Sequence, residues 1–177
     1  NHEIDLIAPF IEALKCENVK NSYRLILYGN TISNEKWNQL GLSEIAEYRG
    51  WLDYSKDVST LKDIDVFLQL LDDNNVSKAG WPNKLGDYLA FGKPVILSPY
   101  GDIIDFVKNE KGFFIVEYNK YSILKILQEI KDIPYSDLKT MGYANRQLAE
   151  KISWKNRAKN IEYICNKIRF NNETVKN

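Results

Sequence analysis

The stretch that decides the fold is Ser77-Lys-Ala-Gly-Trp-Pro-Asn-Lys-Leu-Gly-Asp-Tyr-Leu-Ala-Phe-Gly-Lys-Pro-Val95. It follows a short apolar run, passes through a Gly-x-Pro turn and enters a segment whose apolar residues have helical spacing. A Gly-Lys-Pro step then ends the helix, because glycine and proline both interrupt helices, and a second apolar run begins. The pattern predicts a strand, a helix and a second strand parallel to the first.

The rest of the chain repeats this alternation of apolar runs and amphipathic stretches. The runs are nearly continuous, which is typical of strands covered on both faces in a parallel sheet. The expected strands are Arg24–Tyr28, Glu47–Arg49, Val66–Leu71, Pro94–Ser98 and Gly112–Val116. The expected helices are Asp5–Lys15, Asn34–Leu40, Ser55–Leu61, Pro82–Phe91, Asp102–Asn109, Lys120–Ile130, Tyr135–Lys151 and a last one from Ser153 to about Phe170.

These elements predict an α/β fold. We expect a Rossmann-like three-layer sandwich, in which a doubly wound parallel sheet of about six strands carries helices on both faces. The 177 residues suffice for one domain with a full core, so we expect a single domain over residues 1–170 and a flexible tail over 171–177. Ligands of such sheets bind beyond the carboxyl ends of the strands.

Composition argues against several classes of protein. The 24 basic and 24 acidic side chains cancel, so no net charge points to nucleic acid. No apolar run approaches membrane-spanning length and the first residues are not a signal peptide, which predicts a cytoplasmic protein. Cys16 and Cys165 lack metal-ligand spacing, so we expect free thiols. The only histidine is His2, which leaves no base for a Ser-His-Asp or Cys-His set.

The start of the helix near Pro82 is the strongest candidate for a binding site. Free N–H groups and the positive end of the helix dipole make such a start a natural anion site. Lys84 opposes the dipole there, which makes more sense if an anion lies between the two. An ordinary surface pair between Lys84 and Asp87 is the alternative. The residues predicted to bind are Gly80, Trp81, Pro82, Asn83, Lys84 and Asp87.

Two earlier strand ends are weaker candidates. Gly29 and Asn30 close the first strand, where a glycine either lets the backbone approach a ligand or simply forms a turn from strand to loop. At the next strand end, Gly50 to Leu52, the ring of Trp51 either borders a base or packs into the core or a domain seam. No Gly-x-Gly-x-x-Gly motif follows a strand, so a nicotinamide cofactor is not expected. The Asp72-Asp73 pair is either a cation site or a plain polar loop, and no metal site is predicted.

Several segments, in order, resemble the C-terminal domain of retaining GT-B glycosyltransferases, the group 1 or family 4-like enzymes. Tyr48-Arg-Gly-Trp-Leu52 is similar to the family's F-x-G-x-hydrophobic turn, and Ile64-Asp-Val-Phe-Leu-Gln69 to its A-D-V-F strand. Gly92-Lys-Pro-Val95 matches G-x-P-V, and Lys151-Ile-Ser-Trp154 is similar to the F-S-W that opens the terminal helix. Ala79 to Tyr88 resembles a branch that reads A-G-F-P-T-K-x-x-E-Y.

The resemblance implies a nucleotide-sugar-binding domain, with a nucleotide diphosphate-sugar as substrate and no cofactor or metal. It implies that Lys84 binds the diphosphate and Asp87 the ribose, while the backbone near Gly29, Asn30 and residues 50–52 borders the nucleotide. The intact enzyme would transfer a sugar, with retention of configuration, to a glycan, lipid or other acceptor. Polysaccharide biosynthesis and peripheral membrane contact of the intact protein are further expectations.

The chain departs from the family pattern at two places. Ala79 stands where most members have a sugar-facing glutamate, so that carboxylate is missing. The family's Arg and Lys that grip the diphosphate precede the first helix of this domain, and the acceptor domain precedes them. Both are expected to lie outside this chain, so we expect the chain alone to be inactive and to bind donor weakly.

Three alternatives stay open at this point. A receiver-like signalling domain has a similar fold and a lysine-proline step like Lys93-Pro94, but it needs an acidic cluster near its first strands. A GT-B sugar-nucleotide epimerase shares the fold but depends on carboxylates and histidine. A domain that has kept the fold and lost catalysis would explain Ala79.

Overall fold

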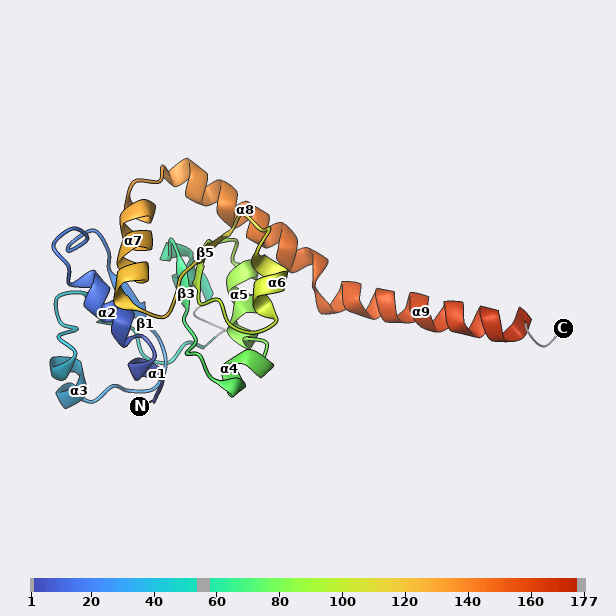
Figure 1. The fold of residues 1–177 in the computed structure, drawn as a ribbon, viewed down its shortest axis with the longest axis horizontal. Helices are drawn as coiled ribbons and strands as arrows, with labels where there is room; N and C mark the ends of the chain where they lie inside the picture. The colour runs from blue at the N-terminus through green and yellow to red at the C-terminus, as the bar shows by residue number, and fades with distance from the viewer. Residues whose placement is uncertain (1, 54–57, 175–177) are drawn as a thin grey trace.

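The computed structural model describes residues 2–53 and 58–174 and shows an α/β body from which one long helix projects (Figure 1). All five expected strands are present with three residues each: four are shorter than expected, and the expected strand Glu47–Arg49 is shifted by one residue toward the amino terminus. The strands are β1 Leu25–Leu27, β2 Ala46–Tyr48, β3 Phe67–Gln69, β4 Val95–Leu97 and β5 Phe113–Ile115. The helices are α1 His2–Asp5, α2 Ala8–Leu14, α3 Asn34–Gln39, the 3-10 helix η1 Val58–Asp63, α4 Asn75–Ala79, α5 Asn83–Ala90, α6 Ile103–Val107, α7 Lys120–Lys131, α8 Tyr135–Lys151 and α9 Trp154–Thr174.

The strands pair in parallel, as predicted, but they form two small sheets. β1 pairs with β2, and β4 lies between β3 and β5. The prediction of one sheet of about six strands is therefore wrong for the described residues. Each strand is only three residues long, and side chains rather than backbone hydrogen bonds join the two sheets: Leu25, Leu27 and Leu68 pack against one apolar cluster.

Helices cover both faces of the strands, which gives the predicted three layers. One cluster joins Ile11 of α2 and Ile123 of α7 to Ile96 of β4. A second cluster joins α5, α6 and α8 to Val95 and Leu97, which point to the opposite face of the same strand. All three residues of β4 are buried, because both faces of this central strand are covered.

The helix boundaries follow the sequence with a few corrections. α8 has the predicted bounds, but the expected helix Asp5–Lys15 is divided into α1 and α2, with Pro9 in the first turn of α2. The expected helix Ser55–Leu61 begins outside the described residues and continues as η1. The last helix continues to Thr174, and the flexible tail and the single-domain boundary remain predictions.

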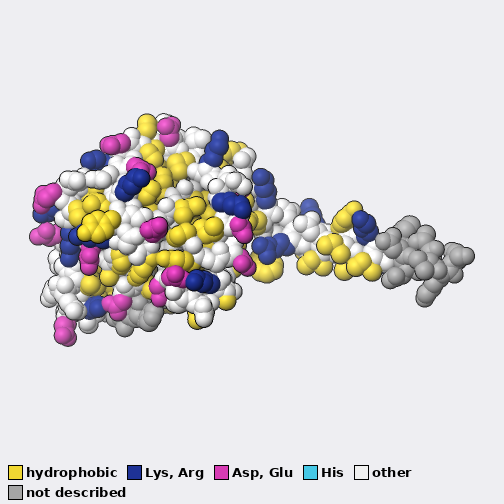
Figure 2. Space-filling model, viewed as in Figure 1, with side chains coloured by type: hydrophobic (Ala, Val, Ile, Leu, Met, Phe, Trp, Pro, Cys, Tyr) yellow, Lys and Arg dark blue, Asp and Glu magenta, His cyan; other side chains and the backbone are white. Residues whose placement is uncertain are grey.

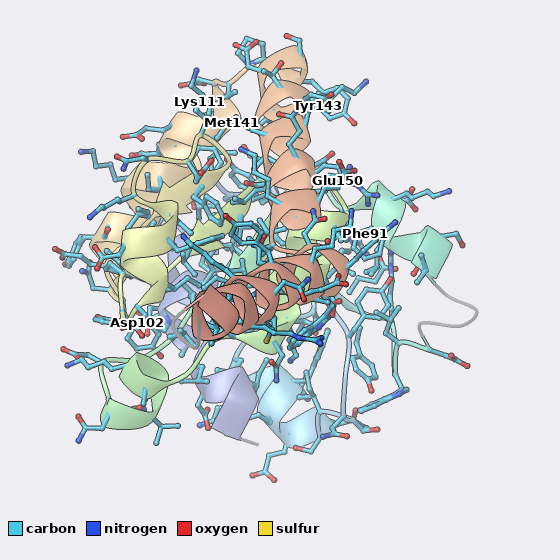
Figure 3. The ribbon with its side chains drawn as sticks, turned by 90° about the vertical axis from the view of Figure 1, so that its right-hand side faces the viewer. Phe91, Asp102, Lys111, Met141, Tyr143 and Glu150 are labelled. Carbon is cyan, nitrogen blue, oxygen red and sulfur yellow. The ribbon has the colours of Figure 1, made fainter. Side chains whose placement is uncertain are left out.

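The sequence did not predict the side-chain hydrogen bonds that join α8 to the amino ends of β4 and β5. Asn145 is fully buried, and its side-chain amide donates to the carbonyls of Lys93 at 2.8 Å and Gly112 at 2.9 Å. Gly142, one turn earlier, lies so close to the Gly92 carbonyl that a Cβ would come within 2.1 Å of that oxygen. Met141 and Tyr143, on either side of Gly142, lie on opposite sides of α8 (Figure 3). The contact face of α8 therefore depends on a small residue.

The helix α9 extends away from the body with an exposed apolar stripe. Trp154, Ile161, Ile164 and Ile168 are each more than half exposed. Apolar side chains gather along one side of this helix, next to basic ones, in Figure 2. Among the described residues, no helix is long and apolar enough to cross a membrane.

Tyr23 links the loop before β1 to α7, and its hydroxyl group should make the domain less stable at alkaline pH. Its hydroxyl donates to the Leu127 carbonyl, and burial, followed by the charge of Asp132, raises the pKa of Tyr23 to about 12. An unfolded tyrosine titrates near pH 10. Because the folded state holds the proton more tightly, we expect the free energy of unfolding to fall as the pH rises from about 10 to about 12. Because the side chain is only partly buried, we expect the loss of unfolding free energy to be no more than roughly 1 kcal/mol.

Urea unfolding of the wild type and of Tyr23→Phe across this pH range measures the effect. The variant should lose less stability with rising pH than the wild type. Identical pH dependence of the two proteins would show that Tyr23 does not control it.

Candidate functional site

The loops after β1 and β2 lie side by side at the carboxyl ends of these strands. The Gly29 amide donates to the Gly50 carbonyl at 2.9 Å, and the Tyr48 hydroxyl donates to the Gly29 carbonyl at 2.8 Å. Both glycines have positive φ, +136° and +75°, and a Cβ at either would meet nothing within 4 Å. The two backbones therefore border open space, where a ligand can approach them closely.

The side chains of these loops point in different directions. Asn30 is exposed, and Trp51 is 73% exposed, so the reading of Trp51 as a core residue is wrong. Leu52 packs against the second apolar cluster, which also contains Leu85 and Leu89 of α5. Tyr28, just before Gly29, packs against the same cluster. This cluster thus connects the strand-end loops to the helix that carries the main candidate site.

Between β3 and that helix lies α4, a short helix that was not predicted from the sequence. Asn74 is its N-cap, and the Asn74 side chain accepts a hydrogen bond from the Ser77 amide at 2.7 Å. Asn at an N-cap was the sequence signal available for this helix. Ala79 is consequently the last residue of a helix, and its side chain is exposed.

The two aspartates before α4 are occupied by this local structure. Asp72 accepts hydrogen bonds from Asn74 at 2.7 Å and from Ser77 at 2.9 Å, and Asp73 forms an ion pair with Lys78. No cluster of three or more His, Cys, Asp or Glu side chains able to hold a metal occurs in the part of the chain that the structure describes. The polar-loop reading of Asp72-Asp73 fits these contacts.

The helix α5 begins one residue later than predicted. Pro82 is the N-cap rather than the first helical residue, because its ψ of 110° keeps it extended. The first intrahelical bond runs from the Leu85 amide to the Pro82 carbonyl at 3.0 Å. The amides of Asn83 and Lys84 precede that bond, so they have no carbonyl within the helix to donate to. Gly80 has φ −110°, which any residue can adopt.

Lys84 and Asp87 lie on the outer face of α5. Leu85 and Leu89 are fully buried on the other face, and Tyr88 stacks on Phe67 with ring centroids 4.3 Å apart. Lys84 and Asp87 are exposed and, among the described residues, do not form an ion pair with each other. The alternative of a simple surface pair is therefore wrong for this structure.

One charged group at the strand ends was not singled out from the sequence. The Arg49 guanidinium donates to Glu47 at 2.8 Å and to the Tyr28 hydroxyl at 3.4 Å. These hydrogen bonds, chiefly the one to Glu47, raise the pKa of Arg49, and the hydrogen bond from Arg49 is the main cause of the lowered pKa of Glu47. The i, i+2 spacing of Glu47 and Arg49 on a strand was the available signal. Arg49 orders the loop rather than offering a free cation.

A second set of polar side chains lies at the carboxyl ends of β3 and β5. Burial raises the pKa of the Tyr118 hydroxyl, with smaller contributions from Asp72, Asp5 and Tyr100. The Gln69 side-chain carbonyl, at the end of β3, is buried without a hydrogen-bond partner among the described residues. Residues distant in sequence thus meet at the carboxyl edge of the larger sheet, where ligands of such folds bind.

Comparison with known families decides what kind of domain this is. The family model described as "Glycosyl transferases group 1" matches residues 7–148, which span every strand and the helices α4 and α5. The chain belongs to the glycosyl transferases group 1. No curated protein matches the sequence.

Solved structures of glycosyltransferases share the fold of this group 1 domain. Sucrose-phosphate synthase from Thermosynechococcus elongatus matches with a TM-score of 0.69 and 15% identity, over 92% of this chain and 42% of that one. Anabaena Alr3699/HepE, solved with UDP, matches with a TM-score of 0.61 and 16% identity, over 81% of this chain and 40% of that one. The same protein solved with UDP-glucose matches with a TM-score of 0.62 and 14% identity, over 81% of this chain and 40% of that one.

The family match and these structures confirm the resemblance to the C-terminal domain of group 1 GT-B glycosyltransferases. At such low identity the structural likeness shows the fold alone. This group 1 chain spans about two fifths of the length of the solved structures, so the activity of a whole enzyme is a matter for proposal.

Proposed function

We propose that this group 1 domain binds the nucleotide diphosphate-sugar donor of a glycosyltransferase. The observation that carries the proposal is the start of α5. There an exposed Lys84 without a partner among the described residues stands next to the amides of Asn83 and Lys84, which have no acceptor within the helix. A cation, two N–H groups and the positive end of a helix dipole suit a diphosphate.

Most of the predicted residues have a role in this proposal. Lys84 and the amides of Asn83 and Lys84 bind the diphosphate; Pro82 has no N–H to contribute. Asp87, one turn along α5, accepts hydrogen bonds from the ribose hydroxyls. The open backbone at Gly29, Asn30 and Gly50 borders the nucleotide, and the exposed ring of Trp51 stacks on the base. Leu52, which packs against the core, supports that loop.

The reaction we propose is transfer of a hexosyl group with retention of configuration. The bond between the anomeric carbon and the diphosphate oxygen breaks, and the acceptor hydroxyl forms the new bond from the same face and transfers its proton to the departing diphosphate. The diphosphate leaves with the electron pair, and Lys84 and the helix start stabilise its charge, so no metal or cofactor is required. The acceptor is a glycan or lipid, bound outside these residues, in polysaccharide biosynthesis in the cytoplasm.

Ligand-induced stabilisation tests the proposal in the full-length enzyme. UDP, GDP, ADP and TDP are titrated separately while the melting temperature is followed. We expect one of them to raise it, because a ligand at a hundredfold excess over Kd stabilises the folded state by about 2.7 kcal/mol. No rise with any of the four would contradict the proposal. For the isolated chain we expect weak or undetectable binding, and micromolar binding would contradict that expectation.

Loss of catalysis is a second candidate, favoured by Ala79. Its methyl group, exposed at the end of α4, cannot hydrogen-bond to a sugar. A domain of this kind would bind the nucleoside diphosphate without turnover in the full-length protein. Group 1 membership gives no support to the receiver-like or epimerase alternatives.

We also propose peripheral membrane contact for the intact protein. The support is the exposed apolar stripe of α9, a helix that also carries the basic residues Lys155, Lys159, Lys167 and Arg169. Co-sedimentation with anionic but not with neutral vesicles is expected, and Ile161→Asp with Ile164→Asp should abolish it. Equal recovery of wild type and variant with both kinds of vesicle would contradict this contact.

A further inference from the structure

The segment that leads into α5 is held in place by the loop after β4. Gly101, in that loop, has a φ of +74°. A Cβ at this position would come within 2.5 Å of the Lys78 carbonyl oxygen and 3.1 Å of the carbonyl carbon and Cα of the same residue. The backbones of the loop and of α4 are therefore in direct contact, which only a glycine permits at this φ.

A second contact lies on the other side of Ala79 and Gly80. The Trp81 ring meets the ring of Phe106 in α6 edge to face, with centroids 5.0 Å apart and an interplanar angle of 79°. Trp81 is 39% exposed, so this contact covers part of the ring and leaves the rest open. Edge-to-face aromatic pairs have a preferred geometry and fix the orientation of both rings.

The helix α4 is tied to the loop that follows β3. Ser77 donates to Asp72, and Lys78 pairs with Asp73. Residues 78–81 are thus bracketed by Gly101 on one side and by Phe106 on the other, and α5 follows directly. A shift of the Lys78 carbonyl would be passed on to Pro82 and the amides of Asn83 and Lys84.

We propose that Gly101 is a positioning residue for the donor site, which acts through the end of α4 and sets where the N–H groups at the start of α5 point. The inference rests on the proposed function. A backbone carbonyl cannot rotate away as a long side chain can, so alanine at position 101 must push α4 and the following turn aside. The effect falls on donor binding rather than on the chemical step.

The test compares Gly101→Ala with Gly41→Ala in the full-length enzyme. Gly41 also has a positive φ, +59°, but a Cβ there would meet only the flexible end of the Lys15 side chain, at 2.8 Å. Both variants therefore carry similar backbone strain, and only one touches α4. We expect Gly101→Ala to raise the donor KM at least tenfold with kcat changed less than threefold, while Gly41→Ala leaves both near wild type.

A ligand-free readout separates this inference from the proposed function. In enzyme labelled with fluorotryptophan, the fluorine resonance of Trp81, assigned with Trp81→Phe, should shift or broaden in Gly101→Ala and stay in place in Gly41→Ala. Phe106→Leu, which removes the ring contact, should raise the donor KM in the same way and serves if Gly101→Ala fails to fold.

An unchanged Trp81 resonance, or a donor KM equal to that of Gly41→Ala, would overturn the inference. The proposed function has its own control in Lys84→Ala. Suppose that the donor KM and kcat are unchanged in Lys84→Ala while the Trp81 resonance still shifts in Gly101→Ala. The proposed donor site would then be wrong, whereas the contact between Gly101 and α4 would still position the turn.

Discussion

Gly142→Ala is expected to destabilise the domain by about 3 kcal/mol. The added Cβ would lie 2.1 Å from the Gly92 carbonyl oxygen and 2.8 Å from its carbon, so α8 must move away from the turn between α5 and β4. That movement also strains the two hydrogen bonds of Asn145, at 2.8 and 2.9 Å, and leaves buried carbonyl groups poorly satisfied. Urea denaturation of wild type and variant measures the difference in the free energy of unfolding.

Gly86→Ala is the matched control for this prediction. Gly86 also lies inside a helix, α5, but a Cβ there meets nothing within 4 Å. Alanine favours helix over glycine by about 1 kcal/mol, so Gly86→Ala should leave the stability unchanged or raise it slightly. If both variants have the same stability as the wild type, α8 is not locked onto the Gly92 turn in the way described.

Lys84→Ala should lower kcat/KM of the full-length enzyme at least a hundredfold, which corresponds to about 2.7 kcal/mol of transition-state stabilisation. The ammonium group stabilises the leaving diphosphate, whose charge develops as the glycosidic bond breaks. Lys84 is exposed and has no partner among the described residues, so its removal should not change the melting temperature of the ligand-free protein. Steady-state kinetics with the donor that stabilises the wild type provides the measurement.

Two further variants sharpen this result. Lys125→Ala removes an exposed lysine from the middle of α7, far from α5 in sequence, and should leave kcat/KM unchanged. Lys84→Arg keeps the positive charge and should recover part of the lost activity. Wild-type turnover in Lys84→Ala would remove the diphosphate role from this residue.

The strands and most helices could be predicted because their signals are local. The apolar run around Val95 to Leu97 predicted a strand buried on both faces, and the structure buries all three residues. Helix α8 could be bounded because Pro134 precedes it and its apolar residues keep helical spacing. The division into two sheets could not be predicted, since it depends on whether β1 and β3 meet through backbone or through side chains.

The residues of the candidate site remain predictions from the sequence, and the structure adds how they are arranged. The sequence predicts Gly29 and Gly50 as two separate candidates, and only the structure shows the 2.9 Å hydrogen bond that joins them. The interactions of Asn145 and Gly101 depend on partners more than 20 residues away, so no local spacing in the sequence predicts them. Lys84 and Asp87 had the spacing of an ion pair, but their side chains do not meet.

The most direct test of the central claim is hydrogen exchange of the full-length enzyme with and without the nucleoside diphosphate that stabilises it. The claim is that this ligand binds at the start of α5. We expect slower exchange of the backbone amides over residues 80–88, with a smaller effect over 28–30 and 50–52, and loss of the protection in Lys84→Ala. Stabilisation by the ligand with unchanged exchange over residues 80–88 would contradict the account.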